Sequence, residues 1–232
     1  YGDYDVDGTS AVSLLYRYLS NHTSLLYTYI PDRYTEGYGI SFQGIDYAAS
    51  KGCSLIIAID CGIKAIDKVQ YATDKDIDFI IGDHHRPDAQ VPNAVAILNP
   101  QQADCPYPYK ELCGCGIGFK LVQAYQQHLS RPFEEIRPLL DLVAIATAAD
   151  IVAMNGENRT LTYFGLEVIN QQPSAGVSAL LGESQKGISI SDVVFKAAPR
   201  INAAGRIEHG NYAVALLTET DSRKAKEKAY EI

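Results

Sequence analysis

The chain has 232 residues, of which 47% are hydrophobic, and a formal net charge of −8. This length and apolar content allow one large domain, or a domain with a smaller lobe. The acidic balance argues against a broad polyanion-binding surface, and no stretch resembles a membrane span or a signal peptide. The five cysteines lie mostly in apolar runs, which suits reduced thiols. We therefore expect a cytoplasmic protein with no membrane association.

The chain begins with three aspartates that alternate with other residues and stop at a glycine: Asp3, Asp5, Asp7 and Gly8. Alternate side chains of an extended segment point the same way, so the three carboxylates can converge on one point. Three like charges held that close raise one another's pKa and destabilise the fold unless a cation lies among them. The pattern indicates a metal site, or else an acidic turn that leads into the helix predicted over residues 11–19.

Apolar strands and helices alternate through the first half of the chain. A β-rich run covers 25–30, and a loop over 31–39 contains Arg33 and two glycines. Further strands are predicted at 54–60, 78–82 and 94–98, with helices at 45–51 and 63–73. The strands at 54–60 and 78–82 are continuous apolar runs, which is typical of strands covered on both faces. The pattern predicts an α/β fold, a Rossmann-like parallel sheet with flanking helices.

Polar side chains follow these buried strands at the points where they end. Asp60 closes one strand before Cys61-Gly62, and Asp83-His84-His85 directly follow the next. Open α/β sheets place their chemistry at the carboxyl ends of the strands. Together with the opening aspartates, successive strand ends thus provide acids or histidines.

The second half of the chain is mainly helical, with helices predicted at 119–129, 139–150, 161–170 and 191–196. Asp150 ends a very apolar helix, although helix C-termini disfavour negative charge. Either Asp150 caps the following turn or a metal compensates its charge. Residues 199–206 place two arginines around a small-residue turn, and 221–232 form a lysine-rich connector helix. We expect an α/β core over 1–130 and a helical remainder over 131–232.

The acids and histidines together form a set of hard ligands. Carboxylate-rich sites with an occasional imidazole suit Mn²⁺ or Mg²⁺, whereas zinc sites favour Cys and His. Six or seven such ligands are too many for one ion. Two ions roughly 3.5–4 Å apart, bridged by a shared carboxylate, would use them all, and this is a geometry of phosphoryl hydrolysis. The candidate ligands are Asp3, Asp5, Asp7, Asp60, His84, His85 and Asp150.

The ordered motifs resemble those of the DHH phosphoesterase superfamily. The resemblance lies in Asp-x-Asp-x-Asp-Gly, a lone strand-end Asp and Asp-His-His. Within the superfamily, residues 1–9, Glu36-Gly-Tyr-Gly39 and 199–206 are similar to the RecJ-type single-strand exonucleases. Small-substrate branches usually open with a histidine-led motif, where this chain has Tyr1. The resemblance covers nearly the whole chain and implies a catalytic core fragment that lacks a C-terminal DHH-associated domain and an oligonucleotide-binding domain.

The resemblance also implies roles for individual residues. Asp60 would bridge two cations, Mn²⁺ or alternatively Mg²⁺, and would form the catalytic group with His84 and His85. Asp3 would take the place of the missing histidine, and His85 would contact phosphate or donate a proton. One ion would be held by Asp3, Asp5 and Asp60, and the other by Asp7, Asp60, His84 and Asp150. Arg33, Arg200 and Arg206 are candidates to bind backbone phosphates, or else ordinary surface residues.

The expected activity is 5′-to-3′ hydrolysis of single-stranded DNA in repair and recombination. The resemblance adds a single-strand binding protein and a helicase as expected partners. An alternative enzyme would be a phosphodiesterase or pyrophosphatase for short oligonucleotides or small nucleotides. A scaffold that binds nucleic acid without cleaving it is disfavoured, because every acidic position of the ligand set is filled.

Overall fold

Three parallel strands in the order β1-β2-β3 form the sheet in the computed structural model, which describes residues 1–182, 184–207 and 210–232, without the side chains of 205–207. The strands are β1 (Leu55–Ile59), β2 (Asp78–Gly82) and β3 (Ala96–Leu98). Ile57 pairs with Ile80, and Ile81 pairs with Ile97. Gly2 adds an isolated parallel bridge to Ile59. The predicted parallel α/β sheet is confirmed.

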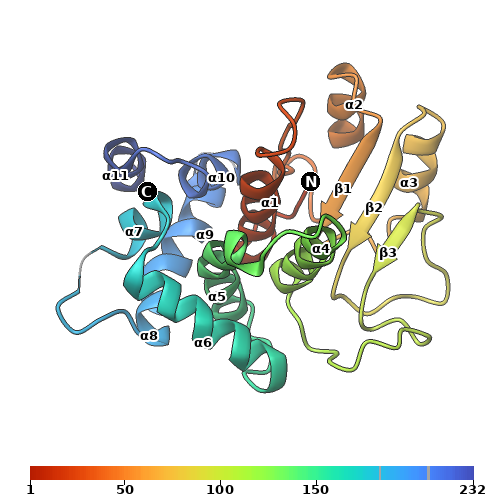
Figure 1. Ribbon diagram of the computed structural model, residues 1–232. Coiled ribbons are helices and arrows are strands. Elements are labelled where there is room, and N and C mark those ends of the chain that lie inside the picture. Colours follow the sequence, from red (N-terminus) through yellow and green to blue (C-terminus); the bar gives the residue numbers. More distant parts are fainter. Residues whose placement is uncertain (183, 208–209) are drawn as a thin grey trace.

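Helices cover both faces of this sheet (Figure 1). On one face, α2 (Phe42–Ser50) and α3 (Ile66–Thr73) pack against Ile56 and Ala58 of β1. On the other, α1 (Val6–Leu19) and α4 (Gly114–His128) pack against Ile57 and Ile59. Because alternate strand residues face opposite sides, burial on both faces requires the continuous apolar run seen in the sequence.

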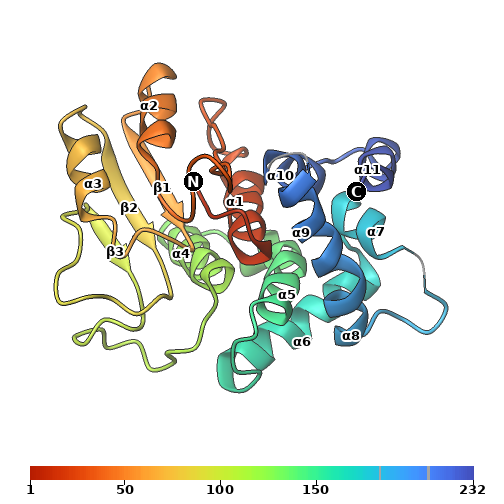
Figure 2. The same ribbon diagram turned by 180° about the vertical axis from the view of Figure 1, so that it is seen from behind.

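The remaining helices gather on the side of α1 away from the sheet, as the two opposite views in Figures 1 and 2 both show. They include α5 (Leu140–Ala149), which is buried from Leu140 to Thr147 and shares one apolar cluster with α1 and α4. The others are the 3₁₀ turns Phe133–Glu135 and Arg137–Leu139, α6 (Gly156–Gln171), α7 (Ala175–Leu181), α8 (Ile190–Asp192), a π-helical turn Val193–Ala197, α9 (Ala198–Ile207), α10 (Gly210–Leu217) and α11 (Ser222–Tyr230).

Two local predictions were wrong. Residues 25–30 form no strand, although the backbone oxygen of Tyr29 accepts a hydrogen bond from Gly2 N at 3.3 Å. The small-residue turn predicted over 199–206 lies within α9. Pro199 lies within the continuous helical run 190–207, directly after the π-helical turn Val193–Ala197, where the regular hydrogen-bond pattern of an α-helix is already interrupted. The last helix, α11, buries Ala225 and Ala229, so one of its faces is packed rather than solvated.

The aspartate at the start of α5 joins three helices. Asp141 is fully buried, and its Oδ1 lies 3.0 Å from Nη1 of Arg17 in α1. Its Oδ2 accepts a hydrogen bond from Ser174 N, just before α7, at 3.1 Å. A buried carboxylate needs such partners, so Asp141 has a structural role. Within the described parts of the chain, no helix is both long and apolar enough to cross a membrane.

Candidate metal centre

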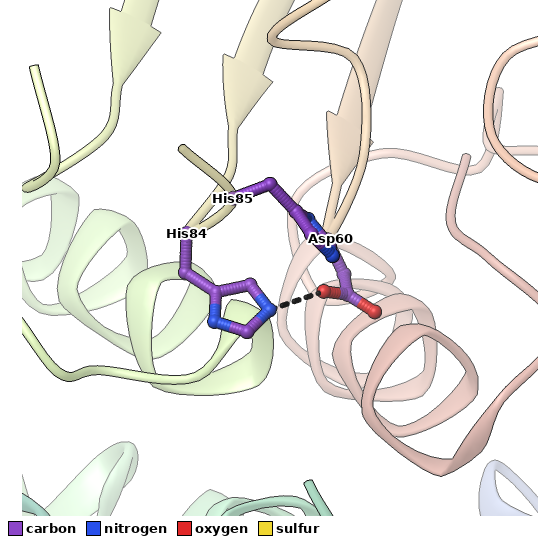
Figure 3. A group of neighbouring side chains, drawn as sticks. All are labelled: Asp60, His84 and His85. Atoms are coloured by element: carbon purple, nitrogen blue, oxygen red, sulfur yellow. Dashed lines mark ion pairs between the residues drawn. The ribbon is translucent and has the colours of Figure 1, made fainter. Parts of the chain in front are cut away.

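The candidate ligands converge where β1 and β2 end. Figure 3 shows Asp60, His84 and His85 just beyond the arrowheads of these strands. Asp60 N donates to the Gly82 carbonyl at 2.8 Å, which continues the strand pairing by one residue. The φ angle of Asp60 is 65°, in the left-handed region that side chains other than Asn and Asp rarely adopt. This turn aims the carboxylate across the end of the sheet.

The carboxylate of Asp60 is buried and accepts no hydrogen bond from the described residues. Asp60 is 1% exposed, and neither of its oxygens has a hydrogen-bond partner within the described structure. His84 Nε2 lies 3.1 Å from Oδ1 (Figure 3). Burial, and then the charge of Asp7, raises the pKa of Asp60 well above its usual range. Unpaired buried carboxylate oxygens are costly, and a divalent cation would compensate them, so these donors fit a metal.

His84 lies between Asp60 and a second pair of acids. Its Nε2 is 3.8 Å from Oδ2 of Asp7, and its Nδ1 is 3.7 Å from Oδ2 of Asp150. The ligand atoms of Asp7, His84 and Asp150 all lie within 4.8 Å of one another, as do those of Asp60, His84 and His85. Burial lowers the pKa of His84, which favours the neutral imidazole that metals bind. The structure thus brings together five of the candidate ligands: Asp7, Asp60, His84, His85 and Asp150.

The N-terminus of α4 holds Asp7 in place. Gly114 N donates to Oδ2 of Asp7 at 2.6 Å, and Cys115 N donates to Oδ1 at 2.8 Å. Exposed N–H groups and the helix dipole both favour a carboxylate at this position. A Cβ on Gly114 would lie 2.4 Å from Cβ of Asp60, so only glycine permits this approach. Sequence reasoning missed Gly114, whose signal is the glycine-rich segment 114–118 that opens a helix.

The other two opening aspartates are placed differently. Asp3 is buried, with Oδ1 accepting from Gly39 N at 3.3 Å and Oδ2 unpaired among the described residues. Asp5 caps α1 by accepting from Gly8 N at 2.9 Å, so the helix begins at Val6, earlier than the predicted residue 11, and Asp7 lies in its first turn rather than in an extended segment. Of the described residues, neither aspartate belongs to a group whose ligand atoms lie within 4.8 Å. Their assignment as ligands stays a prediction.

His85 is oriented by a residue that sequence reasoning did not select. Oδ1 of Asp83 lies 2.7 Å from His85 Nδ1 and accepts from His85 N at 3.0 Å. Oδ2 of Asp83 accepts from Ile63 N at 2.9 Å. The hydrogen bond to Asp83 raises the pKa of His85. The other ring nitrogen, Nε2, lies 3.0 Å from the Tyr38 hydroxyl. The available signal was the position of Asp83 at a strand end.

The three candidate arginines have different surroundings. The guanidinium of Arg33 lies 5.1 Å from the ring centre of Tyr4, next to the opening aspartates. Arg200 donates to the Leu180 carbonyl at 2.7 Å and to that of Ala229, which ties α9 to α7 and α11. Its guanidinium therefore serves helix packing. The side chain of Arg206 lies outside the described residues.

The buried acids predict that the metal-free protein loses stability as pH rises. Burial, and then neighbouring carboxylates, raise the pKa values of Asp3 and Asp150 to about 7. These values exceed the pKa of about 4 of an unfolded carboxyl. The contribution of the two protonated carboxyls to the stability of the fold is therefore complete below about pH 4 and is lost as pH rises through 7. The unfolding temperature in a chelator should therefore fall between pH 5 and about 7.5.

Mn²⁺ must displace the same protons, so its stabilising effect should grow over this range. A double variant, Asp3→Asn with Asp150→Asn, should flatten the pH dependence of the metal-free protein. An unfolding temperature of the metal-free protein that is the same at pH 5 and at about pH 7.5 would contradict the raised pKa values of Asp3 and Asp150. So would a pH dependence that is as steep in the double variant as in the wild type.

Comparison with known proteins agrees with this centre. Residues 1–147 match the DHH family, N-terminal domain. The chain is 42% identical over 235 residues to the single-stranded-DNA-specific exonuclease RecJ of Bacillus subtilis (strain 168), covering 100% of this chain and 29% of that protein. It is 37% identical over 232 residues to RecJ of Escherichia coli (strain K12), covering 93% of this chain and 40% of that protein. The chain thus spans less than half the length of these relatives.

Solved structures show the same fold. A crystal structure of exonuclease RecJ bound to manganese superposes with a TM-score of 0.88 and 29% identity, covering 99% of this chain and 58% of that one. RecJ from Thermus thermophilus in complex with Mn²⁺ gives a TM-score of 0.84 and 27% identity, covering 99% of this chain and 33% of that one. The family match extends over more than half of this chain and includes Asp7, Asp60 and His84. The chain therefore belongs to the DHH family.

Proposed function

We propose that this chain is the catalytic core of a metal-dependent exonuclease that hydrolyses single-stranded DNA from 5′ to 3′. One observation carries the proposal: the buried, unpaired carboxylate oxygens of Asp60 beside His84, next to Asp7 and Asp150. The identity to RecJ exonucleases supports the substrate class. Because the chain spans only part of those relatives, the substrate and the direction of cleavage are proposals.

Asp7, Asp60, His84 and Asp150 would hold the metal, with Asp3 and Asp5 completing the site for a second ion. Carboxylates with one imidazole suit Mn²⁺ or Mg²⁺, and the similar RecJ structures contain one or the other. When bound, two such ions supply a water nucleophile at neutral pH and neutralise charge on the phosphate.

The protein's own residues position the substrate and move the proton. The hydrogen bond that His85 Nδ1 donates to Asp83 keeps His85 protonated to higher pH, with Nε2 directed away from Asp83. His85 can therefore donate a proton from Nε2 to the leaving sugar oxygen, or bind phosphate. Arg33 lies close by and can pair with a backbone phosphate.

We further propose that the protein at its natural length acts in DNA repair and recombination in the cytoplasm. It would carry a DHH-associated and an oligonucleotide-binding domain, and it would work with a single-strand binding protein and a helicase. Co-purification of the natural-length protein with these partners is the test of that context.

The activity is tested by comparing substrates. In the natural-length protein, Mn²⁺ should support degradation of long single strands in preference to dinucleotides, and a chelator should abolish it. Strands labelled at either end give the polarity. Faster hydrolysis of dinucleotides than of long strands would refute the exonuclease and favour a phosphodiesterase for short oligonucleotides, since both enzymes would use the same metal centre.

A further inference from the structure

Residues 32–41 form a loop between the metal centre and an exposed surface. At the inner end, Gly39 N donates to Oδ1 of Asp3 at 3.3 Å, and the Tyr38 hydroxyl lies 3.0 Å from Nε2 of His85. At the outer end, the Arg33 guanidinium lies over the ring of Tyr4, and Tyr34 is 76% exposed. The conformation of this loop therefore determines where a cation and an aromatic ring stand relative to the metal centre.

One carboxylate closes this loop. Both carboxylate oxygens of Glu36 accept from the Tyr29 hydroxyl, at 3.0 and 2.9 Å. Oε1 also accepts from Asp32 N at 2.8 Å, and Oε2 accepts from the Ser41 hydroxyl. The donors thus come from before the loop, from its first residue and from its last. Hydrogen bonds to an ionised acceptor are stronger than neutral ones, so Glu36 holds the two ends together.

The side chain of Tyr1 reinforces the same closure. Its hydroxyl donates to the Gly39 carbonyl at 3.0 Å and accepts from Ser41 N at 3.0 Å. Its ring stacks on Tyr29 with 5.3 Å between ring centres. Tyr29 therefore contacts both Glu36 and the ring that holds the end of the loop.

Two glycines set the direction of the chain at the tip of the loop. Gly37 and Gly39 flank Tyr38, and each has a φ of 83°, a left-handed conformation that glycine adopts without strain. A Cβ on either glycine would meet no described atom within 4 Å. The glycines are needed for the direction of the chain rather than for a close approach. Hydrogen bonds hold the shape of the loop: those to Glu36 join its two ends, and Oδ1 of Asp32 accepts from Tyr34 N and from Thr35 N and hydroxyl within it.

We propose that Glu36 is a positioning residue that holds the 32–41 loop so that Arg33 and Tyr34 receive a single strand entering the metal centre. Glu36 contacts neither metal nor DNA in this role and acts through the loop. A polymeric strand would use the phosphate and base contacts of the loop. A small phosphodiester would reach the metal centre without them. This role of Glu36 rests on the proposed function. It means that the 32–41 loop takes part in binding the substrate.

The test is Glu36→Gln in the natural-length protein with Mn²⁺. A glutamine has one acceptor oxygen for three donors, and its amide group would face hydroxyl and N–H donors. We expect the KM for a long single strand to rise roughly tenfold, with kcat changed less than about twofold. Hydrolysis of bis(p-nitrophenyl) phosphate should be unchanged.

Two further variants sharpen the result. Tyr29→Phe removes one donor and keeps the carboxylate, so it should raise the same KM by a smaller factor. Glu157→Gln is the matched control, because Glu157 also accepts from a tyrosine hydroxyl, that of Tyr107 at 3.0 and 2.7 Å, but lies in α6. It should leave the KM for the strand unchanged.

An unchanged KM in Glu36→Gln would overturn the role of Glu36. So would equal losses on both substrates together with lost Mn²⁺ binding, since Glu36 would then support the metal centre as a whole. If Glu36→Gln does not fold, the KM of Tyr29→Phe for the long single strand tests the role of Glu36 instead, and an unchanged value would overturn it. A wild-type protein that hydrolyses the small ester but not the strand would instead overturn the proposed function, and the role of Glu36 with it.

Discussion

Replacing Asp60 with alanine is expected to abolish phosphodiester hydrolysis while the protein stays folded. Asp60 is the buried carboxylate whose oxygens have no partner among the described residues, and it is the proposed bridge between two cations. Removing it takes away a shared ligand, so the rate should fall by roughly a thousandfold or more. Because the removed carboxyl group is buried without a hydrogen-bond partner among the described residues, the unfolding temperature of the metal-free protein should not fall through lost hydrogen bonds.

The backbone at this position calls for a second variant. With φ at 65°, alanine carries a left-handed strain of roughly 1–2 kcal/mol, whereas asparagine tolerates this region better. Asp60→Asn should therefore lose activity as severely and remain more stable. Asp46→Ala is the control, since Asp46 lies on α2 and pairs with Lys75 at 3.1 Å.

The three readouts are the rate of hydrolysis with Mn²⁺, the binding of Mn²⁺ measured by calorimetry, and the thermal unfolding temperature. Anomalous scattering from crystals soaked in Mn²⁺ should show two ions beside Asp60 in the wild type. Mn²⁺-dependent cleavage that survives in Asp60→Ala would reject the two-metal assignment.

Gly114→Ala is expected to disrupt the centre by adding a single methyl group. The new Cβ would lie 2.7 Å from Oδ1 of Asp60 and 2.8 Å from its Cα. Rotation of the Asp60 side chain cannot relieve a clash with the backbone, so the start of α4 must move away. That movement would break the two hydrogen bonds that hold Asp7. We expect Mn²⁺ affinity to fall roughly 10- to 100-fold and stability to fall by about 1–3 kcal/mol.

The same helix offers a matched control. A Cβ on Gly118 would lie 3.6 Å from Cγ2 of Ile59, which is an ordinary contact distance. Gly118→Ala should keep Mn²⁺ affinity and gain up to about 1 kcal/mol, because alanine favours the helix. Equal Mn²⁺ affinities in Gly114→Ala and the wild type would show that α4 does not position Asp7.

The sequence predicted the sheet well because its signals are local. β2 covers Asp78–Gly82, the range predicted from the apolar run, and β1 lies within the predicted 54–60. Strands buried on both faces must be apolar throughout, and this can be read without knowing their neighbours. The run at 25–30 was misread for the same reason, since its β propensity says nothing about whether a partner strand lies beside it.

By itself, the sequence determined that Asp60, His84 and His85 come together, because acids and histidines directly after buried parallel strands meet at one edge of the sheet. Only the tertiary structure decided how each one is held. Asp7 binds the start of α4, 107 residues away in sequence, and Asp83 orients His85. Arg200 is committed to helix carbonyls, and Glu36 closes its loop. Such contacts depend on the packing of distant segments, which leaves no periodic or local pattern in the chain.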